Sequence, residues 1–346
     1  MMHGSRAKEQ VLGTIAFYRN LFLEVCSMEW ADVLREAAEY IPHVQELCPD
    51  YLEEIQGIGL ALQDDDSSIT WLDVLAINVR TEIMFGLFTD RKKDDIPLDG
   101  CTSLGWKGAN GDSFLAQNWD WFPAQKPNLI VVQVAEGKEG QPGFSMVTEA
   151  GLIGKIGMNT AGVGCCFNAI KARGVDRTRL PLHFALRVVL DSPSMEAAIE
   201  KLERIGVAGS GHILVGDGTG STGLECTSLG IKKLQMDGAG RIVHTNHLLL
   251  DHPGIDEPPW LDDSPVRVAR MNQLLAGASD SPTYEEIFEM FKDEEGYPGS
   301  INRTSEGVAS AGTLFNIIMD LTHRKAWVKF GRTTESTGPS VMLGGD

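Results

Sequence analysis

The most constraining feature of this chain is a change of residue pattern at Gly100-Cys101. Before it, apolar residues recur every three or four positions over about residues 4–28, 30–43 and 51–62, which predicts helices. After it, β-branched and apolar residues alternate with polar ones, which predicts strands. Strands and helices that occur in separate blocks are typical of α+β proteins with antiparallel sheets. We therefore expect an α+β fold with a mostly helical first hundred residues.

Several further elements can be placed from local signals. Thr70-Trp71-Leu72-Asp73 resembles a capping box that begins a helix running toward Phe85. The glycine-rich run 217–220 joins a strand to a strand, so it predicts a hairpin turn and not a phosphate-binding loop. The remaining predicted strands are 129–134, 144–148, 212–215, 223–226, 314–319 and 325–330, and the remaining helices are about 182–190, 194–205, 265–275 and 284–292.

The peptide bond between Gly100 and Cys101 is a candidate cleavage site. The preceding residues 94–100 are charged, contain a proline and end in glycine, which predicts an exposed loop. Cleavage would give Cys101 a free α-amine, whose reference pKa of roughly 7.7 to 8.0 makes it a usable base at neutral pH. Nucleophile and general base would then come from one residue. The alternative is a buried cysteine that acts as a small hydrophobic side chain at the start of a strand.

Asp120 is the second candidate site residue. The Asn-Gly dipeptide in residues 109–112 predicts a hairpin that returns residues 113–122 toward Cys101. The indoles of Trp119 and Trp121 flank Asp120 and could shield it from water. Its carboxylate could hold the α-ammonium of a cleaved Cys101 or polarise the scissile amide, or it could simply satisfy a turn.

Ordered motifs along the chain resemble those of one known family. The matching segments are Cys101-Thr102, residues 117–120 (QNWD), 148–157 (TEAGLIGKIG), 243–247 (VHTNH) and 313–318 (TLFNII). Together they are similar to the acyl-CoA:6-aminopenicillanic acid acyltransferase (isopenicillin N acyltransferase) family of N-terminal-nucleophile hydrolases. The resemblance runs from about residue 3 to the last predicted strand. It implies a four-layer αββα sandwich with two stacked antiparallel sheets, processed into fragments 1–100 and 101–346.

The resemblance also implies roles for other residues. Asn246 would donate its side-chain amide to the oxyanion of a tetrahedral intermediate. Trp121, Phe122 and Phe167 would form walls of an apolar acyl pocket, although ordinary core packing is the alternative. Thr102 and Ser103 could support cleavage by hydrogen bonding near Gly100. His244 and His247 lie three positions apart on a predicted strand and point to opposite faces, so we expect structural histidines and no metal site.

Two positions depart from the family pattern. The family begins with a strand before the His-Gly that corresponds to His3-Gly4, and this strand is missing here. The penicillin enzyme also has an arginine at the position that we align with Ser310, whereas Arg303 belongs to a different motif position. We therefore expect a substrate amine other than the penicillin nucleus.

Charge and cysteine content exclude several functional classes. The net charge of -18 argues against nucleic acid or an anionic membrane as partner, because binding phosphate needs a basic surface. The cysteines form no C-x-x-C pair and no metal-ligand spacing with histidine, which indicates reduced thiols. The start of the chain has no apolar signal core, and the final residues, 343–346, are not a peroxisomal signal. A cytoplasmic location is expected.

The sequence thus predicts a self-cleaving cysteine enzyme with catalytic residues Cys101, Asp120 and Asn246. Cys101 would form an S-acyl intermediate from a small amide or thioester, and an amine or water would then take the acyl group. No cofactor is expected, although acyl-CoA could be a cosubstrate, and the two cleaved fragments would stay associated. Two alternatives are left open: an amidase of the choloylglycine type, and an unprocessed relative that binds a small molecule without chemistry.

Overall fold

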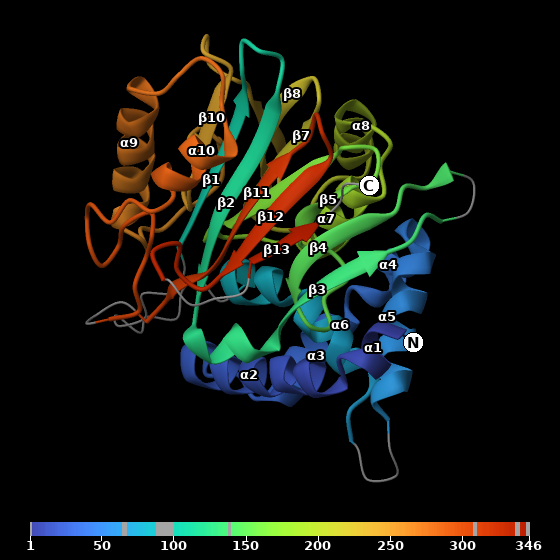
Figure 1. Cartoon of the computed structure of the whole chain (residues 1–346). Coiled ribbons are helices and arrows are strands. Elements are labelled where there is room, and N and C mark those ends of the chain that lie inside the picture. The colour runs from blue at the N-terminus through green and yellow to red at the C-terminus, as the bar shows by residue number, and fades with distance from the viewer. Residues whose placement is uncertain are drawn as a thin grey trace.

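The computed structural model describes residues 2–63, 68–87, 100–137, 140–306, 310–335 and 340–343. Helices dominate the part before Gly100, as predicted (Figure 1). They are α1 (Met2–Arg6), α2 (Lys8–Cys26), α3 (Trp30–Ala38), α4 (Ile41–Leu47), α5 (Pro49–Leu62), α6 (Trp71–Asn78) and the π-helix η1 (Glu82–Leu87). Most of the predicted loop 94–100 lies outside the described residues.

Local sequence signals explain where these helices begin. Thr70 caps α6 with its side chain, and the Asp73 carboxylate accepts a hydrogen bond from the Thr70 backbone N–H at 2.8 Å, so the predicted capping box is confirmed. The segment predicted as one helix over about 30–43 is instead divided between α3 and α4. Pro42 stands in the first turn of α4, where its missing N–H costs nothing, whereas it would break a helix interior.

The strands of the described residues form two antiparallel sheets. The first sheet has six strands in the order β10-β1-β2-β11-β12-β13, and the second has seven in the order β3-β4-β5-β6-β7-β8-β9. The strands of the first sheet are β1 (Gly100–Lys107), β2 (Ser113–Trp121), β10 (Arg241–His244), β11 (Gly312–Asp320), β12 (Lys325–Phe330) and β13 (Ser340–Leu343). Those of the second are β3 (Leu129–Val134), β4 (Phe144–Glu149), β5 (Ile156–Asn159), β6 (Gly164–Ala169), β7 (Gly211–Asp217), β8 (Gly220–Thr227) and β9 (Gly230–Leu234).

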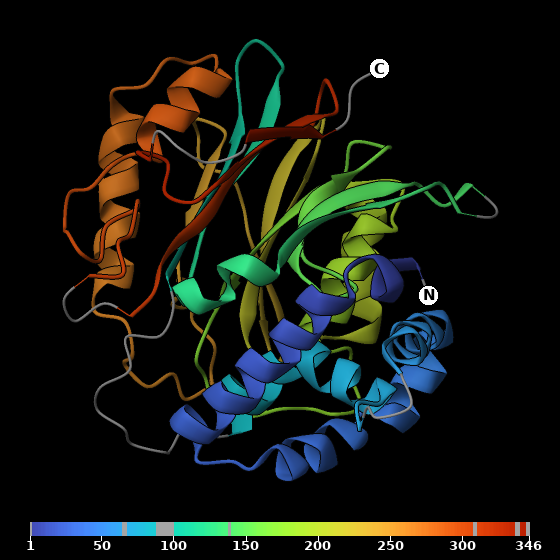
Figure 2. The ribbon, with the colours of Figure 1, turned by 60° about the horizontal axis from the view of Figure 1, so that its bottom comes forward.

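Helices cover the outer faces of both sheets, which gives four layers (Figures 1 and 2). The helices α9 (Asp263–Ala276) and α10 (Tyr284–Met290) lie on the first sheet, and α7 (Leu182–Leu190) and α8 (Met195–Ile205) lie on the second. The N-terminal helices gather at one end, where α2 packs on β4 and on the short 3-10 helix η2 (Pro123–Asn128). The predicted α+β class, a four-layer αββα sandwich with two stacked antiparallel sheets, is confirmed.

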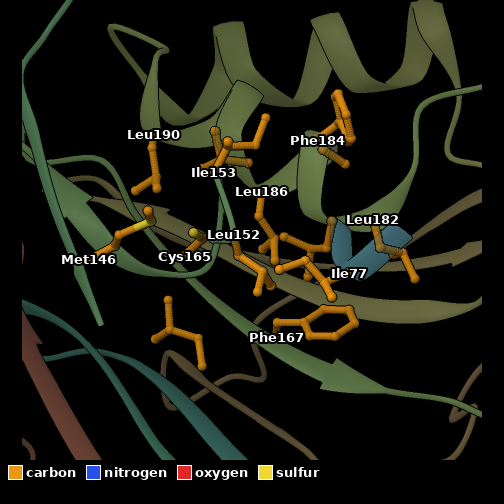
Figure 3. Packing of buried hydrophobic residues seen from close by; sticks show 14 of the residues in the cluster. Ile77, Met146, Leu152, Ile153, Cys165, Phe167, Leu182, Phe184, Leu186 and Leu190 are labelled. Carbon is orange, nitrogen blue, oxygen red and sulfur yellow. The ribbon is translucent and has the colours of Figure 1, made fainter. Parts of the chain in front are cut away.

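The largest core joins the N-terminal helices to the second sheet. Leu152, Phe167, Leu182 and Leu186 pack together with Ile77 of α6 (Figure 3), and each of these side chains is buried. Full burial of such a side chain contributes about 1.5–3 kcal/mol. The described helices before Gly100 therefore share one hydrophobic core with the second sheet.

Candidate active site

The hairpin of β1 and β2 brings the first two candidate residues together. Its register pairs Gly100 with Asp120 and Cys101 with Trp119. The turn over residues 109–112 connects the strands, as the Asn-Gly dipeptide predicted. Asp120 is fully buried and accepts a hydrogen bond at 2.6 Å from the Thr313 hydroxyl of the neighbouring β11. The Asp120 carboxylate therefore lies directly across the sheet from the predicted scissile bond.

Gly100 is a glycine because two charged side chains press against it. A Cβ at this position would lie 2.4 Å from Nε of Arg303 and 2.8 Å from Oδ2 of Asp120. The Arg303 Nε is 3.7 Å from the same Asp120 oxygen, and Arg303 also donates to Asp263 at 2.5 Å. A carboxylate and a guanidinium thus flank the residue before Cys101.

Asn246 follows β10 and contacts the backbone of Cys101. Its side-chain Oδ1 accepts a hydrogen bond from the Cys101 backbone N–H at 2.8 Å, and its Nδ2 donates to the Ala169 carbonyl at 3.0 Å. The Ser264 hydroxyl accepts from the Asn246 backbone N–H at 2.8 Å and fixes this position. An amide NH₂ carries two hydrogens, so one Nδ2 hydrogen is left for a developing oxyanion.

Arg267 of α9 contacts Cys101, Thr102 and Asn246. It donates to the Cys101 carbonyl at 2.6 Å, to Asn246 Oδ1 at 3.0 Å and to the Thr102 hydroxyl at 3.2 Å. The adjacent Ser103 hydroxyl donates to Asn168 Oδ1 at 2.7 Å. The Thr102 and Ser103 hydroxyls thus contact the side chains of Arg267 and Asn168, and their support of cleavage stays a prediction.

A small cavity of about 20 Å³ lies beside Cys101. Trp121 and Phe167 line it, as the acyl-pocket hypothesis requires, whereas Phe122 is outside the lining and packs edge-on against Trp121. The cavity is lined by residues that come before and after Gly100 in the sequence. The complete lining is Tyr18, Arg80, Thr81, Met84, Phe85, Cys101, Trp119, Trp121, Lys155, Phe167 and Ala169. The helical segment therefore supplies part of the wall.

A buried charge network forms one side of this cavity. Glu149 accepts hydrogen bonds from Arg80 at 2.6 Å, from Lys155 at 3.1 Å and from the Tyr18 hydroxyl. Burial alone would raise the pKa of Glu149, but the positive charges of Arg80 and Lys155 outweigh it and lower that pKa. Burial also raises the pKa of Tyr18 well above its usual value, so this hydroxyl is neutral.

The two histidines of the 243–247 motif have separate partners. His244 Nε2 lies 2.9 Å from Glu225 Oε1, and His247 Nδ1 lies 2.8 Å from the Ser264 hydroxyl. Within the described residues, no group of three or more His, Cys, Asp or Glu side chains is arranged to hold a metal ion. None of the described helices is long and apolar enough to cross a membrane.

Several site residues were missed by sequence reasoning. Arg303 reaches Asp120 and Gly100 although it belongs to a different motif position from the aligned Ser310, and Arg267 stands in a helix with no motif of its own. Tyr18 and Arg80 lie far from Cys101 along the chain, so only the folded structure brings them near. Lys155 alone could have been found, because it lies within the matching motif 148–157.

The chain is similar to known proteins over most of its length. The model of the family "Acyl-coenzyme A:6-aminopenicillanic acid acyl-transferase" matches residues 106–335. The chain is also 39% identical over 343 residues to the 40 kDa form of acyl-coenzyme A:6-aminopenicillanic-acid-acyltransferase of Emericella nidulans. This match covers 98% of the chain and 91% of the relative.

Solved structures with a distant likeness include three hydrolases, each 14% identical. They are the Caenorhabditis elegans ortholog of N-acylethanolamine-hydrolyzing acid amidase (TM-score 0.47, covering 64% of this chain and 93% of that one), penicillin V acylase from Agrobacterium tumefaciens (0.45, 70% and 86%) and a variant of conjugated bile acid hydrolase from Clostridium perfringens (0.48, 70% and 92%).

The two antiparallel sheets between helical layers give the αββα order that the resemblance to the N-terminal-nucleophile hydrolases implied. The matching family and the matching relative are acyltransferases, so the chain is an enzyme of the acyltransferase type. The chain belongs to the acyl-coenzyme A:6-aminopenicillanic acid acyl-transferase family, as the family model and the extended identity show.

Proposed function

We propose that the chain cuts itself between Gly100 and Cys101, and that Cys101 then transfers or hydrolyses the acyl group of a small thioester or amide. The observation that carries this proposal is the 2.8 Å hydrogen bond from the Cys101 backbone N–H to Asn246 Oδ1. The nitrogen that would become the α-amine is already held by a side chain, beside the cavity that Cys101 lines.

Self-cleavage begins when the Cys101 sulfur attacks the carbonyl carbon of Gly100. The Gly100–Cys101 C–N bond breaks, and the leaving nitrogen takes the thiol proton to become an amine. Water then hydrolyses the thioester, which leaves a carboxylate on Gly100 and restores the thiol. The position of Asp120 and Arg303 against Gly100 supports this step, because fixed charges stabilise developing charge in a site that excludes water.

Turnover uses the same atoms. The α-amine of Cys101 takes the thiol proton, and the sulfur attacks the acyl carbonyl to form a tetrahedral oxyanion near Asn246. The leaving amine or thiol takes the proton, and the acyl group stays on sulfur until an amine or water removes it. We include acyl-CoA as a candidate donor, since the family description and the Emericella relative both name acyl-coenzyme A.

Within the described residues, the cavity of about 20 Å³ beside Cys101 has room for roughly one water molecule. An acyl donor therefore needs space that the described uncut chain lacks, which fits a proposal in which cleavage comes before turnover. The helical walls, which include Met84 and Phe85, argue against a choloylglycine-type arrangement with only a short leader.

Trapping of the acyl-enzyme tests the proposal. The purified protein is mixed with a short-chain acyl-CoA, quenched in acid and digested, and the peptide that begins at Cys101 is analysed by mass spectrometry. We expect the mass of one acyl group on Cys101 in the wild type and none in Cys101→Ala. An acyl group on another cysteine, or steady turnover by Cys101→Ala, would contradict the proposal. Cys226→Ala serves as a matched control, because Cys226 is also a buried strand cysteine.

A further inference from the structure

Two buried basic side chains, Arg80 and Lys155, line the cavity beside Cys101. Among the described residues that line it, four have ionisable side chains: Tyr18, Arg80, Cys101 and Lys155. The Arg80 and Lys155 side chains are 7% and 1% exposed, so both charges are removed from water. Such burial costs several kcal/mol per ion unless each charge has a partner.

The nearby anion is already neutralised without Lys155. Glu149 pairs with Arg80 at 2.6 Å and accepts further hydrogen bonds from Tyr18 and from Gln125, the latter at 3.3 Å. Lys155 adds a second positive charge to this balanced pair. A second buried carboxyl, Glu82, also faces Arg80, but burial raises the pKa of Glu82 to about 7, so at neutral pH it offsets the added charge only in part. Burial lowers the pKa of Lys155 itself, and the charges of Glu149 and Cys101 oppose that shift. His183 adds no charge, because burial and the Arg80 and Lys155 charges lower its pKa well below the usual value and keep it neutral.

Lys155 and Cys101 line the same cavity, and the Lys155 ammonium lies over the ring of the residue that pairs with Cys101. The Lys155 Nζ lies 4.5 Å from the ring centre of Trp119, and Trp119 is the residue directly opposite Cys101 in the β1–β2 register. Side chains that face each other in this way lie on the same face of the sheet, with Cβ atoms about 4.5–5.5 Å apart. The position is held firmly, because the preceding Gly154 packs so tightly on α7 that a Cβ there would lie 2.1 Å from the His183 carbonyl oxygen.

We propose that Lys155 is the electrostatic partner of the Cys101 thiolate, and that its ammonium sets the pH at which the nucleophile becomes reactive. The inference rests on the proposed role of Cys101 as nucleophile. Of the cavity groups, Tyr18 is held neutral by burial and by its hydrogen bond to Glu149, so the thiolate is the anion that matches the added positive charge. Lys155 acts through Cys101 and is a positioning residue in that sense.

The test measures the reactivity of the Cys101 thiol as a function of pH. The cleaved enzyme is alkylated with iodoacetamide between pH 5 and 10, and the rate is read from the Cys101 peptide by mass spectrometry. The midpoint is the pH at which the alkylation rate reaches half of its maximum. We expect Lys155→Met to move this midpoint upward by about one pH unit or more. Lys155→Arg, which keeps the charge, should stay near the wild type, and so should Lys126→Met, which removes a half-exposed lysine.

Glu149→Gln gives a second test in the opposite direction. This change removes the negative charge that competes with the Cys101 thiolate for Lys155, but it keeps an oxygen to accept hydrogen bonds. The pH midpoint of alkylation should therefore fall. It decides the question if Lys155→Met does not fold. Unchanged midpoints in the folded variants would overturn the inference while leaving the nucleophile proposal intact, whereas absence of any acyl group on Cys101 in the wild type would overturn the nucleophile itself.

Discussion

Gly100 leaves no room for a larger residue beside the predicted scissile bond. Gly100→Ala would place a methyl group 2.4 Å from Arg303 Nε and 2.8 Å from Asp120 Oδ2. Such overpacking costs about 1–3 kcal/mol, so we expect self-cleavage roughly five- to 150-fold slower, as measured by the loss of the full-length band with time. Gly218→Ala is the matched control, because nothing lies within 4 Å of its Cβ position. A Gly100→Ala chain that cuts at the wild-type rate would contradict the account.

Asp120 should act through its charge. Asp120→Asn keeps an oxygen for the Thr313 hydroxyl, and Arg303 keeps Asp263 as a partner. We therefore expect cleavage to slow by roughly tenfold or more, at a cost in stability of about 1 kcal/mol, because the electrostatic contribution at Gly100 is lost. Asp320→Asn, in another buried aspartate of the same sheet, should cleave normally. Equal rates for both variants would show that the Asp120 charge is not needed.

At the scale of elements, Glu225 of β8 ties that strand to the segment after β10. It accepts hydrogen bonds from His244 at 2.9 Å, from His252 at 2.8 Å and from the Leu249 backbone N–H at 2.6 Å. Burial alone would raise the pKa of Glu225, but these hydrogen bonds lower it to about 2. The hydrogen bond from His244 has the largest lowering effect. A lowered pKa stabilises the fold above pH about 4.5, and this contribution is lost as the pH falls toward 2.

Glu225→Gln should therefore be less stable than its parent at pH 6, by on the order of 1–3 kcal/mol. The difference should shrink at pH 3, because the carboxylate contribution of the parent is then partly lost. Urea unfolding at the two pH values measures this, in a Cys101→Ala background so that the chain stays whole. A difference that is the same at both pH values would refute the assignment.

Most elements could be predicted because their signals are local. The capping box at Thr70, the Asn-Gly hairpin before Asp120 and the strand-to-strand turn at 217–220 are all confirmed. Short elements such as β13 were missed, since four residues carry too little periodicity. The Glu149 network could not be predicted, because its members Tyr18, Arg80 and Lys155 meet only through tertiary packing.

At the scale of the whole molecule, the two fragments should stay together after cleavage. Hydrogen bonds cross between them from Asn78 to the Gly151 carbonyl at 2.9 Å, from Arg187 to Glu54 at 2.7 Å and from Tyr51 to Asp191 at 2.8 Å. The shared core adds buried apolar contacts. We expect co-elution in size-exclusion chromatography without denaturant and separation in 6 M guanidinium chloride. Separation in native buffer would contradict a common core.

The most direct test of the central claim is the intact mass of the purified, denatured protein, with N-terminal sequencing of each fragment. Self-cleavage at Gly100-Cys101 should give fragments of roughly 11 and 27 kDa from the 37.7 kDa chain, in proportion to their lengths, with the larger beginning at Cys101. Cys101→Ala should give a single uncut chain. A wild-type protein that stays whole, or a cut at another bond, would contradict the assignment of Cys101 as an N-terminal nucleophile.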